Sequence, residues 1–336
     1  MMNVLVCESP GQLSLVLRPM PLRAPHEVLI RVRRVGICGT DMHIFRGTQP
    51  YLSYPRVMGH ELAGEVIEAP PGSHLASGDQ VFVMPYLSCG TCMACRKFRP
   101  NCCMKMEVLG VHRDGGLAEY LSVNDAFVFK ADGVTLDEAA MIEFLAIGAH
   151  AVKRGSVGSG SRVLVVGAGP IGIAVALFCQ LEGADVTAID GREDRLEFCR
   201  NVLGTTVLAA DEQAEQRLRK LTNGDFFDVV FDATGNSKAM ESGFAYVGHA
   251  GSYVLVSIVN STIGFSDPEF HRREMTLLGS RNATVADFER VIAAMRAGLV
   301  PTQALNTHRV SLAQLPQVLP EWMSPAAGVI KGIVEF

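Results

Sequence analysis

The feature that most constrains the fold of this chain is a glycine-rich turn near its middle. Residues 162–166 read RVLVV, an apolar run typical of a buried parallel strand, and residues 167–172 read GAGPIG. Residues 173–181 continue with the apolar pattern of a helix. Strand, G-x-G-x-x-G turn and helix in this order are the fingerprint of a dinucleotide-binding βαβ unit. We therefore expect a doubly wound α/β domain here.

The residue types in this turn suit a bound pyrophosphate. Gly167 permits the tight turn, Gly169 lets the backbone approach the phosphates, and Gly172 allows the helix to pack closely on the strand. The N-terminus of the helix that follows the turn favours negative charge. The turn is therefore expected to hold the phosphates of a dinucleotide.

The second predicted strand bears on which dinucleotide binds. Residues 185–189 are expected to form this strand, which ends at Asp190. A carboxylate there would accept hydrogen bonds from the adenosine ribose and repel a 2′-phosphate, which favours NAD over NADP. Arg192 leaves the alternative open, since its guanidinium could reach a 2′-phosphate.

The α/β alternation continues beyond this point. Residues 227–231, 252–256 and 276–278 are expected to form further strands of one doubly wound domain. The loops at 233–235 and 257–260 follow strand ends, so they either border the nicotinamide or are plain turns.

A cysteine-rich segment is the second strong signal. Residues 89–103 read CGTCMACRKFRPNCC and hold five of the nine cysteines of the chain. Four soft ligands suit a closed, structural zinc site, and these are Cys89, Cys92, Cys95 and Cys103. An iron–sulfur run is disfavoured, because the gap from Cys95 to Cys103 is longer than the C-x2-C-x2-C-x3-C-P spacing.

A disulfide explanation for these cysteines is weaker. The chain does not open with a basic segment followed by a short apolar one, and no apolar run is long enough to span a membrane. We therefore expect a cytoplasmic protein whose thiols stay reduced. A net charge of −5 with interspersed signs gives no footprint for nucleic acid.

The N-terminal third reads differently. Short β-rich stretches at 27–35, 61–68 and 80–83 lie between glycine and proline turns, as in a compact all-β domain. The same part holds a thiol, an imidazole and two carboxyls that could form a zinc site with an open position, namely Cys38, His60, Glu61 and Glu143. Each alone is a weak signal, because a lone histidine is more often a core residue than a ligand.

Several motifs together carry a family resemblance. The run CGTDMH at 38–43, GHE at 59–61, the four cysteines and the glycine-rich turn resemble the zinc-containing medium-chain alcohol and polyol dehydrogenases over essentially the whole chain. This implies a GroES-like β-barrel catalytic domain from 1–146 and 289–336, with a zinc lobe at about 86–106. A Rossmann domain would span 147–288.

The resemblance also implies roles for individual residues. Cys38, His60 and, in the sorbitol-dehydrogenase-like branch, Glu61 would bind a catalytic zinc, with Glu143 either a fourth ligand or the partner of a zinc-bound water. Asp41 would orient a ligand histidine. Thr40 would take the substrate proton and His43 would pass it toward solvent. The implied cofactor contacts are Gly167, Gly169, Pro170, Ile171, Gly172, Asp190, Arg195, Thr234 and Lys331, the last reaching the pyrophosphate.

The implied activity is oxidation of a secondary alcohol with two zinc ions per chain and NAD as hydride acceptor. The nearest branch holds sugar-acid 5-dehydrogenases of the gulonate or galactonate type and starvation-sensing dehydrogenases, so a polyol or sugar acid is the expected substrate. Arg113 or Arg281 could bind a substrate carboxylate, or could be ordinary surface residues. Phe144 departs from the proline usual in relatives.

Other interpretations stay open at this stage. Threonine or another secondary alcohol could be the substrate, and a non-catalytic protein that binds zinc and NADH could share the fold. The family makes a homodimer or homotetramer the expected assembly.

Overall fold

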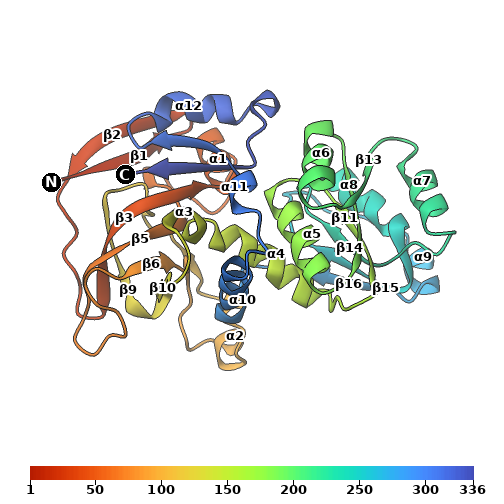
Figure 1. The fold of residues 1–336 in the computed structure, drawn as a ribbon, viewed down its shortest axis with the longest axis horizontal. Helices are drawn as coiled ribbons and strands as arrows, with labels where there is room; N and C mark the ends of the chain where they lie inside the picture. The colour runs from red at the N-terminus through yellow and green to blue at the C-terminus, as the bar shows by residue number, and fades with distance from the viewer. The chain divides into compact units, whose positions relative to one another are not determined.

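The computed structural model describes residues 1–336, and the chain divides into two compact units. Unit 1 consists of residues Met1–Glu143 and Thr284–Phe336, and unit 2 consists of residues Phe144–Ala283. Figure 1 shows the fold, with labels on many of the helices and strands. No helix of the chain combines the length and apolar character that a membrane span requires.

Unit 1 is built mainly from β-strands. Its main sheet has seven strands, in the order β10-β6-β5-β3-β18-β17 with β9 also paired to β3 (Figure 1). These strands are β3 (Glu27–Ile37), β5 (Glu61–Glu68), β6 (Gln80–Val83), β9 (Tyr120–Asn124), β10 (Val128–Lys130), β17 (Asn306–Ser311) and β18 (Lys331–Glu335). The expected strands at 27–35, 61–68 and 80–83 are therefore confirmed.

Smaller elements complete unit 1. A second sheet joins β2 (Gln12–Arg18), β1 (Met2–Ser9) and β4 (Arg56–Val57), and β7 (Tyr86–Leu87) pairs with β8 (Glu107–Val108). The helices are α1 (Gly39–Arg46), α2 (Met93–Arg96), α3 (Leu136–Ala139), α10 (Val285–Arg296), α11 (Thr302–Leu305) and α12 (Leu315–Trp322). Short 3-10 helices span Pro100–Cys102, Asp125–Phe127 and Pro325–Ala327. The apolar core brings together side chains from β1, β3, β5, β6 and α12.

Unit 2 is a doubly wound α/β fold. Its six strands run in the order β13-β12-β11-β14-β15-β16 and all pair in parallel, which is the 3-2-1-4-5-6 order of a Rossmann sheet (Figure 1). The strands are β11 (Arg162–Val166), β12 (Asp185–Asp190), β13 (Thr206–Ala209), β14 (Phe227–Asp232), β15 (Val247–Leu255) and β16 (Thr276–Gly279). The expected Rossmann domain is therefore observed.

Five helices of unit 2 connect these parallel strands, and a sixth, α4 (Ile142–Arg154), precedes the first strand and begins at the end of the first segment of unit 1. The connecting helices are α5 (Pro170–Leu181), α6 (Glu193–Val202), α7 (Ala214–Leu221), α8 (Ser237–Gly243) and α9 (Asp267–Arg272), with a 3-10 turn at Phe244–Tyr246. Residues 172–179 of α5 are all buried. An all-round apolar helix of this kind belongs in a core, as the sequence pattern indicated.

Candidate active site

Three potential metal ligands gather in unit 1. The ligand atoms of Cys38, His60 and Glu61 all lie within 4.8 Å of one another, and we refer to these residues as the Cys38 cluster. Cys38 follows the end of β3 and caps α1, while His60 and Glu61 stand at the start of β5. Because β3 and β5 pair in the main sheet, residues distant in sequence meet here.

The Cys38 cluster has the chemistry of a zinc site. Thiolate, imidazole and carboxylate are all zinc donors, and three protein ligands leave a fourth position open. Burial alone would lower the pKa of His60, but the nearby Asp41 and Cys38 raise it well above its usual value. A field that favours a positively charged imidazole also favours a divalent cation, so these residues fit the metal.

Asp41 ties the two segments of the cluster together. Its carboxylate is buried and accepts hydrogen bonds from the main-chain N–H groups of Cys38, at 2.9 Å, and Gly59, at 3.1 Å. Its Oδ1 lies 3.9 Å from Nδ1 of His60, a buried nitrogen that has no hydrogen-bond partner. Asp41 therefore acts on His60 through charge, and on the cluster by fixing its two backbone segments.

Thr40 and His43 lie one turn apart on α1. Residues three apart are neighbours on one helix face. Thr40 is half-buried, whereas His43 is exposed, and Nδ1 of His43 is 2.9 Å from the hydroxyl oxygen of Thr48. The arrangement leads from a half-buried hydroxyl beside Cys38 to an exposed imidazole.

Lys331, which the family resemblance assigns to a cofactor pyrophosphate, lies in the same region. Its ammonium is 2.6 Å from both carboxylate oxygens of Glu61 and donates to the carbonyl oxygen of Ile37 at 3.2 Å. The contact with a pyrophosphate stays a prediction. Lys331 is 1% exposed and Glu61 is 0% exposed. Burial would lower the pKa of Lys331, but Glu61 and Cys38 raise it, so the side chain stays charged.

Glu143 is buried in the first turn of α4 but falls outside the Cys38 cluster. The hydroxyl of Tyr86 donates a hydrogen bond to its Oε1. Burial raises the pKa of both groups, most strongly that of Tyr86, which remains a donor. Sequence reasoning did not single out Tyr86, because nothing in the local pattern around it indicates a partner far along the chain.

The four cysteines of the lobe also come together. Cys89, Cys92, Cys95 and Cys103 are free thiols whose sulfur atoms lie within 4.8 Å of one another. Three of the sulfur–sulfur distances are 3.5, 3.5 and 3.9 Å. Tetrahedral zinc with ligands at 2.3 Å requires sulfur atoms about 3.8 Å apart. The four-cysteine lobe therefore fits a closed zinc site.

Main-chain N–H groups support the thiolates of this lobe. Lys105 and Cys89 donate to the sulfur of Cys103, each at 3.3 Å. Hydrogen bonds from the backbone at Thr91 lower the pKa of Cys89 to about 6, so this thiol ionises readily. Hydrogen bonds from the backbone at Cys95 and Met104 also lower the pKa of Cys92, whereas burial raises the pKa of Cys95 to about 12. The backbone of the lobe therefore favours the thiolate, the form that zinc binds, at Cys89 and Cys92.

The glycine-rich turn in unit 2 has the expected geometry. Gly167 has a φ of +93°, and a Cβ placed on Gly172 would overlap the carbonyl oxygen of Gly167. A Cβ on Gly169 would meet no atom within 4 Å. The open space at Gly169 is where a pyrophosphate would approach the backbone. Pro170 and Ile171 form the first turn of α5.

Asp190 stands beside this turn at the end of β12. Its carboxylate accepts hydrogen bonds from the N–H groups of Ala168, at 2.7 Å, and Arg192, at 2.8 Å. The Arg192 guanidinium forms two hydrogen bonds with Asp194, at 2.6 and 3.0 Å. Arg192 is therefore already engaged by a carboxylate.

Two further predicted cofactor residues, Thr234 and Arg195, also belong to unit 2. Thr234 borders Gly167, and its N–H and hydroxyl both donate to Asp232. Arg195, in α6, is buried with its Nε 3.9 Å from Asp194. Burial raises the pKa of Asp232 to about 6.

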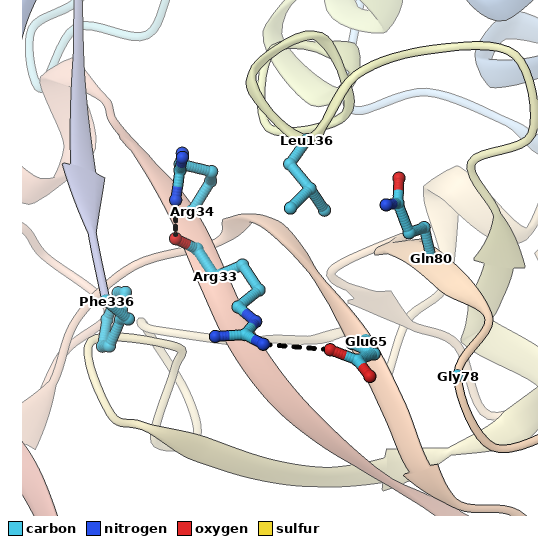
Figure 2. Close-up of a pocket in the computed structure, with 7 residues that line it drawn as sticks. All are labelled: Arg33, Arg34, Glu65, Gly78, Gln80, Leu136 and Phe336. Carbon is cyan, nitrogen blue, oxygen red and sulfur yellow. Dashed lines mark hydrogen bonds and ion pairs between the residues drawn. The ribbon is translucent and has the colours of Figure 1, made fainter.

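Unit 1 has two surface hollows, and only one of them is lined by predicted residues. Figure 2 shows one of about 460 Å³, in which Arg33 of β3 points to Glu65 of β5 at 3.1 Å. None of the predicted site residues lines it. A larger hollow of about 770 Å³ is lined by Cys89 and Arg113, among others. Arg113 is exposed there and lies 3.6 Å from Glu107.

Comparisons with known families agree with this architecture. Residues 24–133 match the model of the alcohol dehydrogenase GroES-like domain, and residues 170–297 match that of the zinc-binding dehydrogenase. The chain is 42% identical over 337 residues to L-galactonate-5-dehydrogenase of Escherichia coli K12, covering 100% of this chain and 99% of that protein. It is 31% identical over 325 residues to sorbitol dehydrogenase of Bacillus subtilis 168, covering 93% and 91%.

Solved structures give the same result. The rspB alcohol dehydrogenase of E. coli CFT073, complexed with NADH, matches with a TM-score of 0.93 at 28% identity, covering 100% of this chain and 99% of that one. A zinc-binding dehydrogenase of Sinorhizobium meliloti 1021, bound to NADP, matches with a TM-score of 0.91 at 27% identity and the same coverage. The chain therefore belongs to the zinc-binding, GroES-like alcohol and polyol dehydrogenases, a family of NAD(P)-dependent oxidoreductases.

Proposed function

We propose that this enzyme oxidises a secondary hydroxyl of a polyol or sugar acid to a ketone and transfers the hydride to NAD. The observation that carries the proposal is the Cys38 cluster, in which Cys38 is half-buried and His60 and Glu61 are buried, next to Thr40 and His43 on α1. Its three donors would leave a fourth position open on zinc. The similarity to an E. coli protein named L-galactonate-5-dehydrogenase supports a sugar-acid substrate.

Two zinc ions per chain are part of this proposal. One would be held by Cys38, His60 and Glu61, and the other by the four-cysteine lobe. Unit 1 would then be the catalytic domain and unit 2 the NAD-binding domain. We also propose, from the family, a homodimer or homotetramer that works in the cytoplasm.

The residues near the Cys38 cluster have separate tasks. When bound, zinc would act as a Lewis acid on the substrate hydroxyl, and NAD would accept the hydride. The Thr40 hydroxyl would take the substrate proton and pass it to the ring of His43, whose exposure lets it release the proton to water. Asp41 holds the backbone of Cys38 in place, and Lys331 balances the charge of Glu61.

Asp190 supports a preference for NAD over NADP. A carboxylate has about four acceptor positions, and the two main-chain donors to Asp190 leave room for ribose hydroxyls. A 2′-phosphate would be repelled by the same charge. Because Arg192 is paired with Asp194, it is a weak candidate for binding that phosphate.

The proposal is tested by measuring NADH and NADPH formation by zinc-loaded enzyme on a panel of polyols, aldonates, threonine and simple alcohols. We expect turnover of one secondary alcohol of the polyol or aldonate group, faster with NAD than with NADP. Cys38→Ser should abolish this turnover while the four-cysteine lobe keeps its zinc. Full activity of Cys38→Ser, or silence across the panel from protein holding both zincs, would contradict the proposal.

A further inference from the structure

Besides Asp41, whose carboxylate is bonded to the backbone, two buried carboxylates lie near the proposed catalytic metal, and each has a different partner. Glu61 belongs to the Cys38 cluster and is bonded by Lys331 through both oxygens. Glu143 lies outside the cluster and is bonded by the hydroxyl of Tyr86. A divalent cation attracts both carboxylates, so something must decide which of them becomes a ligand.

The ring of Tyr86 is held firmly by aromatic neighbours. It meets Phe288 of α10 edge to face, with ring centroids 6.2 Å apart and planes at 71°. Phe288 in turn stacks on Phe82 of β6, with centroids 5.8 Å apart. All three rings are buried. The Tyr86 hydroxyl is thus fixed in position, and a carboxylate bonded to it is fixed as well.

We propose that Tyr86 is a positioning residue that holds Glu143 outside the metal coordination sphere and so keeps the fourth position open for substrate. The inference rests on the proposed zinc-dependent function. A buried carboxylate deprived of this hydrogen bond would gain most by moving onto the cation. Four protein ligands then make a closed site of the structural kind, which has no position left for a substrate oxygen.

The test is Tyr86→Phe in the full-length protein, which keeps the ring and its packing on Phe288. Zinc remains in the four-cysteine lobe while cobalt replaces the metal of the Cys38 cluster. We expect a changed cobalt visible spectrum, metal loss to a chelator slowed about tenfold, and kcat/KM lowered about 10-fold to 100-fold. If Tyr86 had a merely structural role, Tyr86→Phe would instead lose its metal to the chelator faster than the wild type.

Further variants make the test independent of this one substitution. Glu143→Gln alone should retain the wild-type cobalt spectrum, because Glu143 is not a ligand while Tyr86 holds it. In that background Tyr86→Phe should alter neither the spectrum nor the rate of metal loss. The matched control is Tyr253→Phe, which removes a buried hydroxyl that donates to the carbonyl of Met240 at 2.9 Å in unit 2. It should leave both readouts unchanged.

Four results would overturn the inference: a wild-type spectrum and metal-loss rate in Tyr86→Phe, faster metal loss in Tyr86→Phe, an altered spectrum in Glu143→Gln, or an equal effect of Tyr86→Phe in both backgrounds. The spectrum and the metal-loss rate require no turnover. If the wild-type enzyme oxidised nothing on the substrate panel, the proposed function would fail while these readouts still decided the role of Tyr86.

Discussion

Glu61 and Lys331 form a buried ion pair. Removing two charges from water costs several kcal/mol for each, and their mutual attraction offsets this only with good geometry. Here the ammonium meets both carboxylate oxygens at 2.6 Å and a main-chain carbonyl as well. The ammonium of Lys331 thereby offsets the charge of one of the three buried carboxylates of this region, which are Asp41, Glu61 and Glu143.

Replacing Lys331 should therefore be costly. We expect Lys331→Met to lower the free energy of unfolding of the metal-free protein by about 3–5 kcal/mol, because it leaves the Glu61 carboxylate buried without its cation. Denaturant unfolding measures this difference. The exposed Lys220→Met is the control and should stay within about 0.5 kcal/mol of wild type. A loss no larger than that of the control would show that the pair contributes little.

The sequence predicted the members of the Cys38 cluster but not the contacts around them. The family resemblance identifies Cys38, His60 and Glu61, through the CGTDMH run at 38–43 and the GHE run at 59–61. Lys331 and Glu61 are 270 positions apart, and Tyr86 and Glu143 are 57 apart, so no local pattern links either pair. Such contacts depend on which strands become neighbours, which only the folded chain reveals.

At the scale of elements, the glycine-rich turn joins packing and binding in six residues. A Cβ at Gly172 would overlap the Gly167 carbonyl, whereas one at Gly169 would meet nothing. Gly172 thus allows the close approach of α5 to β11. Gly169 leaves open space beside the N-terminus of α5, where we place the pyrophosphate.

Alanine substitutions should separate these two roles. Gly172→Ala should destabilise the protein by about 1–3 kcal/mol or more, because the obstructing atom is backbone and the helix must shift. Gly169→Ala should leave the free energy of unfolding nearly unchanged and weaken NADH binding. Thermal unfolding and NADH fluorescence titration measure the two effects. Equal stability losses in both variants, or unchanged NADH affinity in Gly169→Ala, would contradict this division.

The elements of unit 2 were largely predictable, and their differences from the prediction have local causes. Strand 162–166 is confirmed with its full length, and the helix expected from 173 begins earlier, at Pro170, because proline suits the first helical position. Strand β15 begins at Val247 instead of Ser252. Its first half contains Gly248 and Gly251, which read as turn residues, and Ala250 has a φ of +59°. An irregular strand of this kind gives no alternating pattern.

At the scale of the whole molecule, the two units differ in how the chain builds them. Unit 2 is one continuous segment, residues 144–283, with its own apolar core. Unit 1 needs both ends of the chain, because β18 from the C-terminal segment lies between β3 and β17 in the main sheet (Figure 1). The family resemblance implied this return of the chain, whereas composition and periodicity alone did not.

This connectivity predicts different behaviour for isolated fragments. Residues 144–283 expressed alone should unfold cooperatively and bind NADH, because all six strands of the sheet and the glycine-rich turn are included. Circular dichroism during thermal unfolding and fluorescence titration with NADH test this expectation. The fragment carrying Gly169→Ala is the matched control, which should unfold like the parent fragment but bind NADH more weakly.

Residues 1–143 alone should behave in the opposite way. Without β18, residues 34–37 of β3, next to Cys38, lose the strand with which they pair. Lys331 is also missing, so Glu61 would be buried without its cation. We expect no cooperative unfolding transition from this fragment, and recovery of one when residues 284–336 are supplied as a second chain. A stably folded 1–143 fragment would show that the sheet forms without β18 and Lys331. It would also contradict the loss of unfolding free energy expected for Lys331→Met.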